Sequence, residues 1–296
     1  MKAGSFARLD TLRRVCAVLL VLLPSWCDAQ GRRGGGRGGG GRGGGGATYL
    51  DDFTDQAMSW PINPAFKDDV FVFARLKHQS GGGYGYARRA SWQEDYPLAD
   101  IMLPYRVHQT TAIAVRPGPN PIDFEKDELA KCPFIYLAGV ETMALQEREV
   151  TTLRSYLLNG GFMMVDNFWG DAAWTNFARQ MKRVFPDRTA TELQLEHPIF
   201  HVVYDFKAKA QMPSTGVWMN FGVFYDPNRD YDVMGHDPHY FAFFDDKGRL
   251  MMIICHNNHY GDGWEHESDD IDYFHVISEG MAYPMFINIL MYAMTH

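Results

Sequence analysis

Short apolar runs alternate with longer amphipathic segments from about residue 65 to the end of the chain. The short runs are rich in aromatic and β-branched residues and are bounded by polar residues, glycine or proline, which is typical of buried strands. We predict four such strands, at Asp69–Arg75, Thr111–Val115, Phe134–Ala138 and Phe162–Val165.

The longer segments repeat apolar residues at helical spacing. In Gln146–Leu158, the residues Val150, Leu153, Leu157 and Leu158 are predicted to share one face, and Gly160 stands where a helix commonly ends. Two further helices are predicted in Asp171–Phe185 and Met281–Met294, and a helix interrupted by two prolines is predicted in Trp92–His108.

A β-hairpin is predicted late in the chain, because Tyr240–Phe244 and Arg249–Cys255 flank the turn residues Asp245–Gly248. Strands that alternate with helices through short connections favour a mostly parallel sheet covered on both faces. We therefore predict a single α/β domain in residues 48–296, doubly wound, with the hairpin as a mixed edge of its sheet.

The amino-terminal segment has the layout of a secretory signal peptide. Basic residues precede an apolar run of nine residues, Val15–Leu23, and the small residue Ala29 stands before Gln30. We expect residues 1–29 to be removed and the protein to be exported to the periplasm or the medium. Lipid attachment at Cys27 and an uncleaved anchor stay open. No later segment has the ~20 apolar residues that a membrane-spanning helix needs.

A flexible linker is predicted in residues 30–47, where positions 31–46 consist of twelve glycines and four arginines. The chain has a formal charge of −8, but the remainder after residue 47 carries −14, with 20 basic and 34 acidic residues. An acidic body argues against a nucleic-acid partner, which requires a basic face. We expect a small polar ligand or a partner in the cell envelope.

Four motifs support a comparison with a known family. They follow one another as Trp92–Asp100, Pro133–Gly139, Leu153–Asp166 and His197–His201. Over about residues 67–296 the chain resembles the bacterial family called domain of unknown function 4159, which is similar to the class I glutamine amidotransferases. The resemblance implies a flavodoxin-like α/β fold, and it implies no established activity.

The same resemblance places Asp166 and Asn167 near the turn where amidotransferases carry a nucleophilic cysteine. No cysteine lies within reach in the sequence, so we expect no glutaminase activity. Asp166 ends a predicted central strand, at the edge where α/β sheets bind ligands, and we name it a candidate catalytic residue together with His197. Candidate ligand-binding residues are Asp95, Tyr96, Asn167 and His201.

Histidines and carboxylates gather after the last predicted strand. His256, His259, Asp262 and Glu265 combine imidazole with carboxylate oxygens, which suits zinc or another divalent ion. We take these four residues as a candidate metal site; the alternative is a solvated acidic loop beside surface histidines. The cofactor itself stays unknown.

Two other features carry weaker signals. Cys132 and Cys255, the cysteines that remain after cleavage, are either small buried side chains or a disulfide. The segment Gly81–Gly85 follows a strand but matches no phosphate-binding motif, so we interpret it as a loop at the sheet edge. Two functions remain open. The first is a binding or scaffold module of the envelope, and the second is a hydrolase or carbohydrate-related enzyme that uses Asp166 and histidines.

Overall fold

A computed structural model describes residues 57–67, 69–81, 91–221 and 237–296. The chain divides into two units, of which Met1–Gly44 lies outside the described residues, so Gly45–His296 is considered by itself. The predicted signal peptide, the predicted linker and most of the glycine-rich segment Gly81–Gly85 also lie outside the described residues. No helix within the described ranges is long and apolar enough to cross a membrane.

A seven-stranded sheet forms the centre of the domain, in the order β2-β1-β3-β4-β7-β6-β5. The first five of these strands pair with one another in parallel. Strand β6 pairs antiparallel with β7 on one side and with β5 on the other. The mostly parallel sheet with a late hairpin, predicted above, is confirmed. The strands are β1 (Ala74–Leu76), β2 (Asn120–Ile122), β3 (Phe134–Ala138), β4 (Phe162–Asp166), β5 (Thr191–Glu192), β6 (His239–Phe244) and β7 (Leu250–His256).

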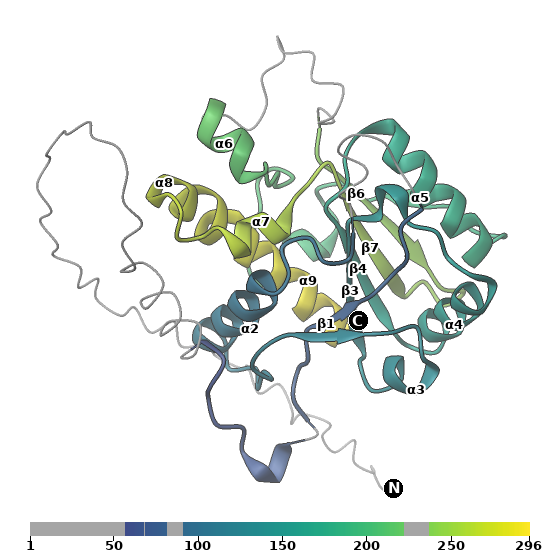
Figure 1. Ribbon diagram of the computed structural model, residues 1–296, viewed down its shortest axis with the longest axis horizontal. Coiled ribbons are helices and arrows are strands. Elements are labelled where there is room, and N and C mark those ends of the chain that lie inside the picture. The colour runs from purple at the N-terminus through teal and green to yellow at the C-terminus, as the bar shows by residue number, and fades with distance from the viewer. Residues whose placement is uncertain (1–56, 68, 82–90, 222–236) are drawn as a thin grey trace, which may run out of the picture. The chain divides into compact units, whose positions relative to one another are not determined.

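Helices cover both faces of the sheet (Figure 1). One face packs against α3 (Lys126–Leu129), α4 (Glu147–Leu158) and α5 (Gly170–Val184), and the other against α2 (Leu98–Thr110), α7 (Tyr260–Glu265) and α9 (Tyr283–Thr295). The remaining elements are η1 (Pro64–Phe66), η3 (Val140–Thr142), η4 (Pro198–Phe200), α6 (Thr215–Phe221), α8 (Ile271–Tyr273) and the π-helix η5 (Phe274–Ala282).

Two hydrophobic cores lie on the opposite faces of this sheet. Successive side chains of a strand point to opposite faces, so Tyr136 joins the core under α2, α7 and α9, whereas Ile135 and Leu137 join the core under α3, α4 and α5. All five residues of β3 are therefore buried. Burial on both faces explains why the central strands read as unbroken apolar runs.

The long elements match their predictions and the short edge strands do not. Helices α4, α5 and α9 and the β6–β7 hairpin form where the periodicity indicated them, and Gly160 follows α4 with a left-handed φ of 108°. The predicted strand Thr111–Val115 is wrong. Only Val115 bridges to Phe71, because the chain then turns at Gly118 and pairs with β1 further on, as β2.

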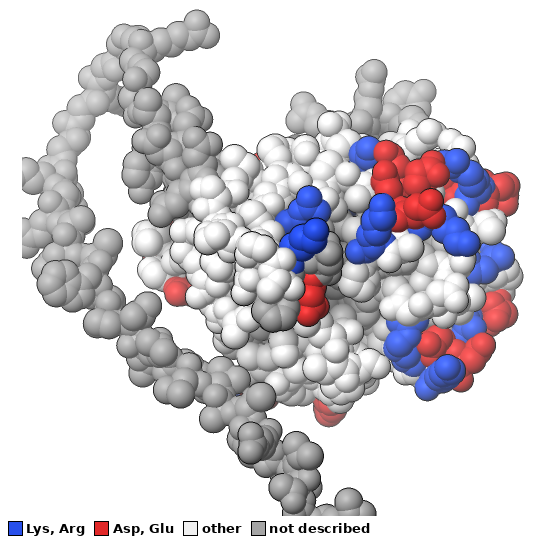
Figure 2. Space-filling model, turned by 90° about the horizontal axis from the view of Figure 1, so that it is seen from below, with Lys and Arg blue, Asp and Glu red and all other residues white. Residues whose placement is uncertain are grey.

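Charged side chains of both signs intermingle on the face of the molecule in Figure 2. Ion pairs join segments that are separate in sequence, such as Arg183 with Glu147 and Arg148 with Glu125. Both described cysteines, Cys132 and Cys255, are buried and free, so the alternative of small buried side chains holds for this structure.

Candidate functional site

The carboxyl ends of the parallel strands bring polar residues together. The chain places β1 between β2 and β3, so the strand order reverses direction at the β1–β3 boundary. In open α/β sheets ligands bind outside the carboxyl ends of the strands at such a reversal. Asp166 is the last residue of β4 and lies opposite Ala138, the last residue of β3, in the ladder.

Asp166 is fully buried at this edge. Its Oδ2 accepts hydrogen bonds from the hydroxyl of Tyr136 at 2.8 Å and from the backbone N–H of Gly261 at 3.1 Å. Its Oδ1 is buried and has no hydrogen-bond partner among the described residues. Burial raises the pKa of Asp166 to about 6, and the nearby His259 opposes this rise. A buried carboxylate with an unpaired oxygen is unusual in a purely structural role.

Beside Asp166, the buried residues Asp95, His259 and Asp262 form a cluster, which we call the Asp–His–Asp cluster. His259 Nε2 lies 3.0 Å from Oδ2 of Asp95 and 3.2 Å from Oδ1 of Asp262. Burial opposes protonation of His259, but the charges of Asp262 and Asp95 outweigh it and hold the pKa of the imidazole well above its usual value. The cluster therefore holds a buried positive charge between two carboxylates.

Arg75 positions the segment that carries Asp95. Its guanidinium donates to the carbonyl oxygens of Trp92 at 3.1 Å and Glu94 at 2.9 Å. It also forms a fully buried ion pair with Asp100 at the start of α2, with Nε 2.8 Å from Oδ2. This one side chain, from β1, therefore anchors both ends of the 92–100 segment.

Backbone strain gathers at the same edge. Within the described residues, three non-glycine residues have a left-handed backbone: Asp95 (φ 61°), Asn167 (φ 57°) and Asn257 (φ 58°). Such conformations persist only where the surrounding structure imposes them, and they are concentrated at functional sites. Asn167 follows β4 directly and Asn257 follows β7 directly, so each turns the chain sharply at a strand end.

Further carboxyl groups surround the cluster. Burial raises the pKa of Glu141, which follows β3, to about 7. Burial and the charge of Asp95 raise the pKa of Glu265 to about 7, and burial also raises the pKa of Glu94. Groups whose pKa lies near neutral pH can both accept and donate protons, which is the property that general acid–base chemistry requires.

Residues 72–294 match the model of a family described as "Domain of unknown function (DUF4159)". The chain belongs to this family. The matched segment contains the whole Asp–His–Asp cluster, and it also contains the adjoining Asp166. No curated protein matches the chain.

The DUF4159 domain brings some of the predicted site residues together. Asp95, His259 and Asp262 form the cluster, and Asp166 and Glu265 adjoin it. Asn167 is buried next to Asp166, and the half-buried ring of Tyr96 lies 5.4 Å from that of Trp92.

Three predicted histidines lie apart from the cluster. His256 faces the opposite side of the sheet, where its ring lies 4.9 Å from Phe168 and burial lowers its pKa to about 4. His197 caps η4 by accepting from the N–H of Ile199 at 3.3 Å, and His201 pairs with Asp205. Of the four residues predicted to bind a metal, His259 and Asp262 lie in the cluster and Glu265 adjoins it, whereas His256 lies apart. Asp95, which the sequence analysis named as a ligand-binding residue, completes the cluster.

Sequence reasoning missed Glu94, Tyr136, Glu141 and Arg75. Glu141 stands just after β3, so the rule that singled out Asp166 at the end of β4 was sufficient to find it. Tyr136 lies inside an apolar strand, where the sequence does not separate it from ordinary core residues. Arg75 ends the predicted strand Asp69–Arg75, where a charged side chain is ordinarily exposed, so its burial was not expected.

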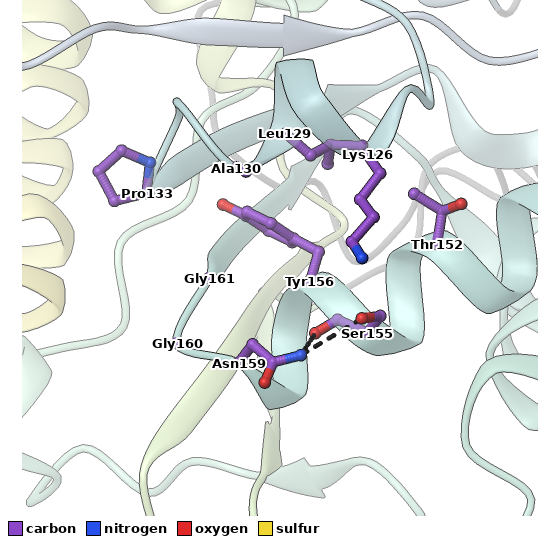
Figure 3. A pocket seen from close by; sticks show the side chains of 10 residues that line it. All are labelled: Lys126, Leu129, Ala130, Pro133, Thr152, Ser155, Tyr156, Asn159, Gly160 and Gly161. Carbon is purple, nitrogen blue, oxygen red and sulfur yellow. Dashed lines mark hydrogen bonds between the residues drawn. The ribbon is translucent and has the colours of Figure 1, made fainter.

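A pocket of about 510 Å³ lies at the amino ends of the parallel strands, away from the carboxyl ends that carry the cluster (Figure 3). Pro133 and Gly161, which line it, directly precede β3 and β4, so it opens at the amino ends of these strands. Lys126 and the small polar side chains of α4 surround it, and Asn159 donates to Ser155 there. It contains none of the predicted site residues.

Proposed function

We propose that this DUF4159 domain binds a small, neutral, hydroxyl-rich ligand such as a sugar at the carboxyl edge of its sheet. The observation that carries the proposal is the convergence of Asp95, Asp166, His259 and Asp262 from separate chain segments. Carboxylates accept hydrogen bonds from hydroxyl groups and repel anionic ligands. The adjacent rings of Trp92 and Tyr96 offer apolar surface to the carbon skeleton of such a ligand.

We further propose a flavodoxin-like, amidotransferase-like fold without glutaminase activity. The five parallel strands follow the order 2-1-3-4-5 in sequence terms, which is the flavodoxin-like order. Asn167 turns the chain after β4 with a left-handed φ, where an amidotransferase presents its cysteine. Cys255 on the neighbouring β7 is fully buried and burial raises its pKa far above the usual value, so it supplies no thiolate.

Replacing Asp166 tests the binding proposal. In Asp166→Asn the amide oxygen keeps both hydrogen bonds, to Tyr136 and Gly261, and the amide nitrogen takes the place of the unpaired Oδ1. We expect the free energy of unfolding to change by no more than about 1 kcal/mol. Binding of neutral mono- and disaccharides, measured by saturation-transfer NMR, should weaken at least about tenfold, because a charge-assisted acceptor is lost.

The exposed carboxylate of Asp123 provides the matched control, since Asp123→Asn should leave binding unchanged. Tighter binding of uronic acids or sugar phosphates than of neutral sugars would contradict the proposal, and so would normal binding by Asp166→Asn.

The second candidate is a hydrolase. It is favoured by Asp166, Glu141 and Glu265, whose pKa values of about 6 to 7 suit proton transfer near neutral pH. The two candidates differ in outcome, because a hydrolase converts a bound disaccharide whereas a binding module leaves it intact. The same NMR samples, followed over hours, distinguish them.

The order of charged, apolar and small residues in 2–29 supports export as part of the proposed function. We expect the mature chain to begin near Gln30. Amino-terminal sequencing of protein recovered from the periplasm or medium checks this, and an intact Met1 in that material would rule it out.

A further inference from the structure

We propose that Asp95, His259 and Asp262 bind a divalent transition-metal ion, which the neighbouring Asp166 helps to hold. The inference rests on the proposed function, since it adds a cation to the same binding site. It also changes the ligand set that the sequence suggested, because one ligand comes from the segment before α2 and two from the chain after β7.

The spacing of the three side chains fits a metal site. His259 Nε2 lies 3.0 Å from Asp95 Oδ2 and 3.2 Å from Asp262 Oδ1, and the three ligand atoms all lie within 4.8 Å of one another. Ligands at ~2.0–2.2 Å from a metal ion, at tetrahedral or octahedral angles, lie roughly 2.9–3.5 Å apart. An ion can therefore replace the proton between the imidazole and the carboxylates with little movement of the side chains.

Charge also favours a cation here. Among the described residues, six carboxyl groups interact at this edge. The described groups there that can carry positive charge are the imidazoles of His259 and His266 and the guanidinium of Arg75, which Asp100 already neutralises. The six carboxyl groups belong to Glu94, Asp95, Glu141, Asp166, Asp262 and Glu265. Burying several carboxylates without a counter-charge is costly, and a divalent ion removes much of that cost.

Asp166 supplies the second, independent observation. Its Oδ1 is completely buried and has no hydrogen-bond partner among the described residues. Its Oδ2 accepts from Gly261, and a Cβ on Gly261 would lie 1.9 Å from Oδ2 of Asp95, so the carboxylates of Asp166 and Asp95 meet at this glycine. A buried carboxylate oxygen without a partner, on a residue that adjoins the Asp–His–Asp cluster, is the kind of group that a bound cation satisfies.

The ligand types narrow the choice of metal. One imidazole nitrogen with carboxylate oxygens suits Zn²⁺ or Mn²⁺ better than Ca²⁺, which prefers oxygen ligands alone. His266 forms a second group with Asp262 and Glu265, but it is half-buried and already pairs with Asp269 at 2.7 Å. We therefore place the ion in the Asp–His–Asp cluster.

Zinc uptake by the full chain tests the proposal. After treatment with EDTA and dialysis against Zn²⁺, elemental analysis should find one zinc per chain. Asp95→Asn and Asp262→Asn preserve shape but remove one charged ligand each, and both should weaken zinc binding at least about tenfold. His256→Gln and His201→Gln are the matched controls, because both residues lie apart from the cluster, and both variants should bind zinc as the wild type does.

Two results would overturn the metal site: no zinc or manganese uptake by folded wild type, or undiminished uptake by folded Asp95→Asn. Circular dichroism identifies a variant that has not folded. In that case the number of zinc ions bound per wild-type chain decides whether the metal site exists. Failure of the metal site is distinguishable from failure of the proposed function. Zinc binding by a chain that binds no sugar supports the metal site, whereas sugar binding unaffected by EDTA in a chain that takes up no zinc overturns it.

Discussion

Arg75→Met is expected to lower the free energy of unfolding by about 3–5 kcal/mol, because it leaves the carboxylate of Asp100 buried without its partner. Both side chains of this pair are completely inaccessible to solvent. Burial raises the pKa of Asp100, and the charge and hydrogen bonds of Arg75 oppose that rise. The variant also removes the donor to the carbonyl oxygens of Trp92 and Glu94, so the segment that carries Asp95 loses its anchor.

Urea unfolding at neutral pH measures the effect. Lys77, two residues after Arg75, provides a matched control, because its ion pair with Asp123 leaves the two side chains 31% and 58% exposed. Lys77→Met should change the free energy of unfolding by less than about 1 kcal/mol. The double variant Arg75→Met/Asp100→Leu should recover part of the loss, since no unpaired charge remains. Equal effects of Arg75→Met and Lys77→Met would refute the proposed role of the buried pair.

Gly139→Ala should lower the free energy of unfolding by about 3 kcal/mol. Gly139 follows β3 with a left-handed φ of 63°, which disfavours any residue with a Cβ by about 1–2 kcal/mol. In addition, a Cβ there would lie 2.3 Å from the carbonyl oxygen of Ser91, which is backbone and cannot rotate away. Overpacking of this kind costs about 1–3 kcal/mol. The displaced Ser91 leads directly into Asp95, so ligand or metal binding should weaken as well.

Gly118 isolates the conformational part of this effect. Its φ of 78° is also left-handed, but a Cβ there would meet nothing within 4 Å among the described residues. Gly118→Ala should therefore cost only the conformational part, about 1–2 kcal/mol, and should leave the site intact. Thermal and urea unfolding of the two variants side by side give the difference. A larger loss in Gly118→Ala than in Gly139→Ala would contradict the close approach to Ser91.

The sequence was most informative where one element repeats a pattern over several turns. Helices α4 and α5 were predicted almost to the residue, because their apolar faces recur over twelve and fifteen residues. The edge strand β2 and its neighbour β1 have only three residues each, so their apolar pattern is too short to define a boundary. Pro121 lies within β2, and proline ordinarily counts against a strand except at a sheet edge.

The candidate site was predicted in part for a similar reason. Asp166 ends a strand that the sequence identified, so its place at the edge of the sheet followed from the fold. His256 and His259 were equivalent in sequence, but β7 continues through His256 and directs that side chain away from the cluster. Asp95 precedes His259 by 164 residues, and no local pattern reveals a contact over that distance.

That long separation also determines when the site can exist. The contact between Asp95 and His259 closes a loop that contains most of the domain, and it requires β7 to have docked beside β4. Closing long loops has a large entropic penalty and comes late in folding. A chain whose synthesis has not yet reached β7 therefore cannot assemble the Asp–His–Asp cluster. The uptake of zinc or sugar that we propose for this edge would then report a finished fold, and a kinetic experiment that follows it would monitor a late step of folding rather than an early one.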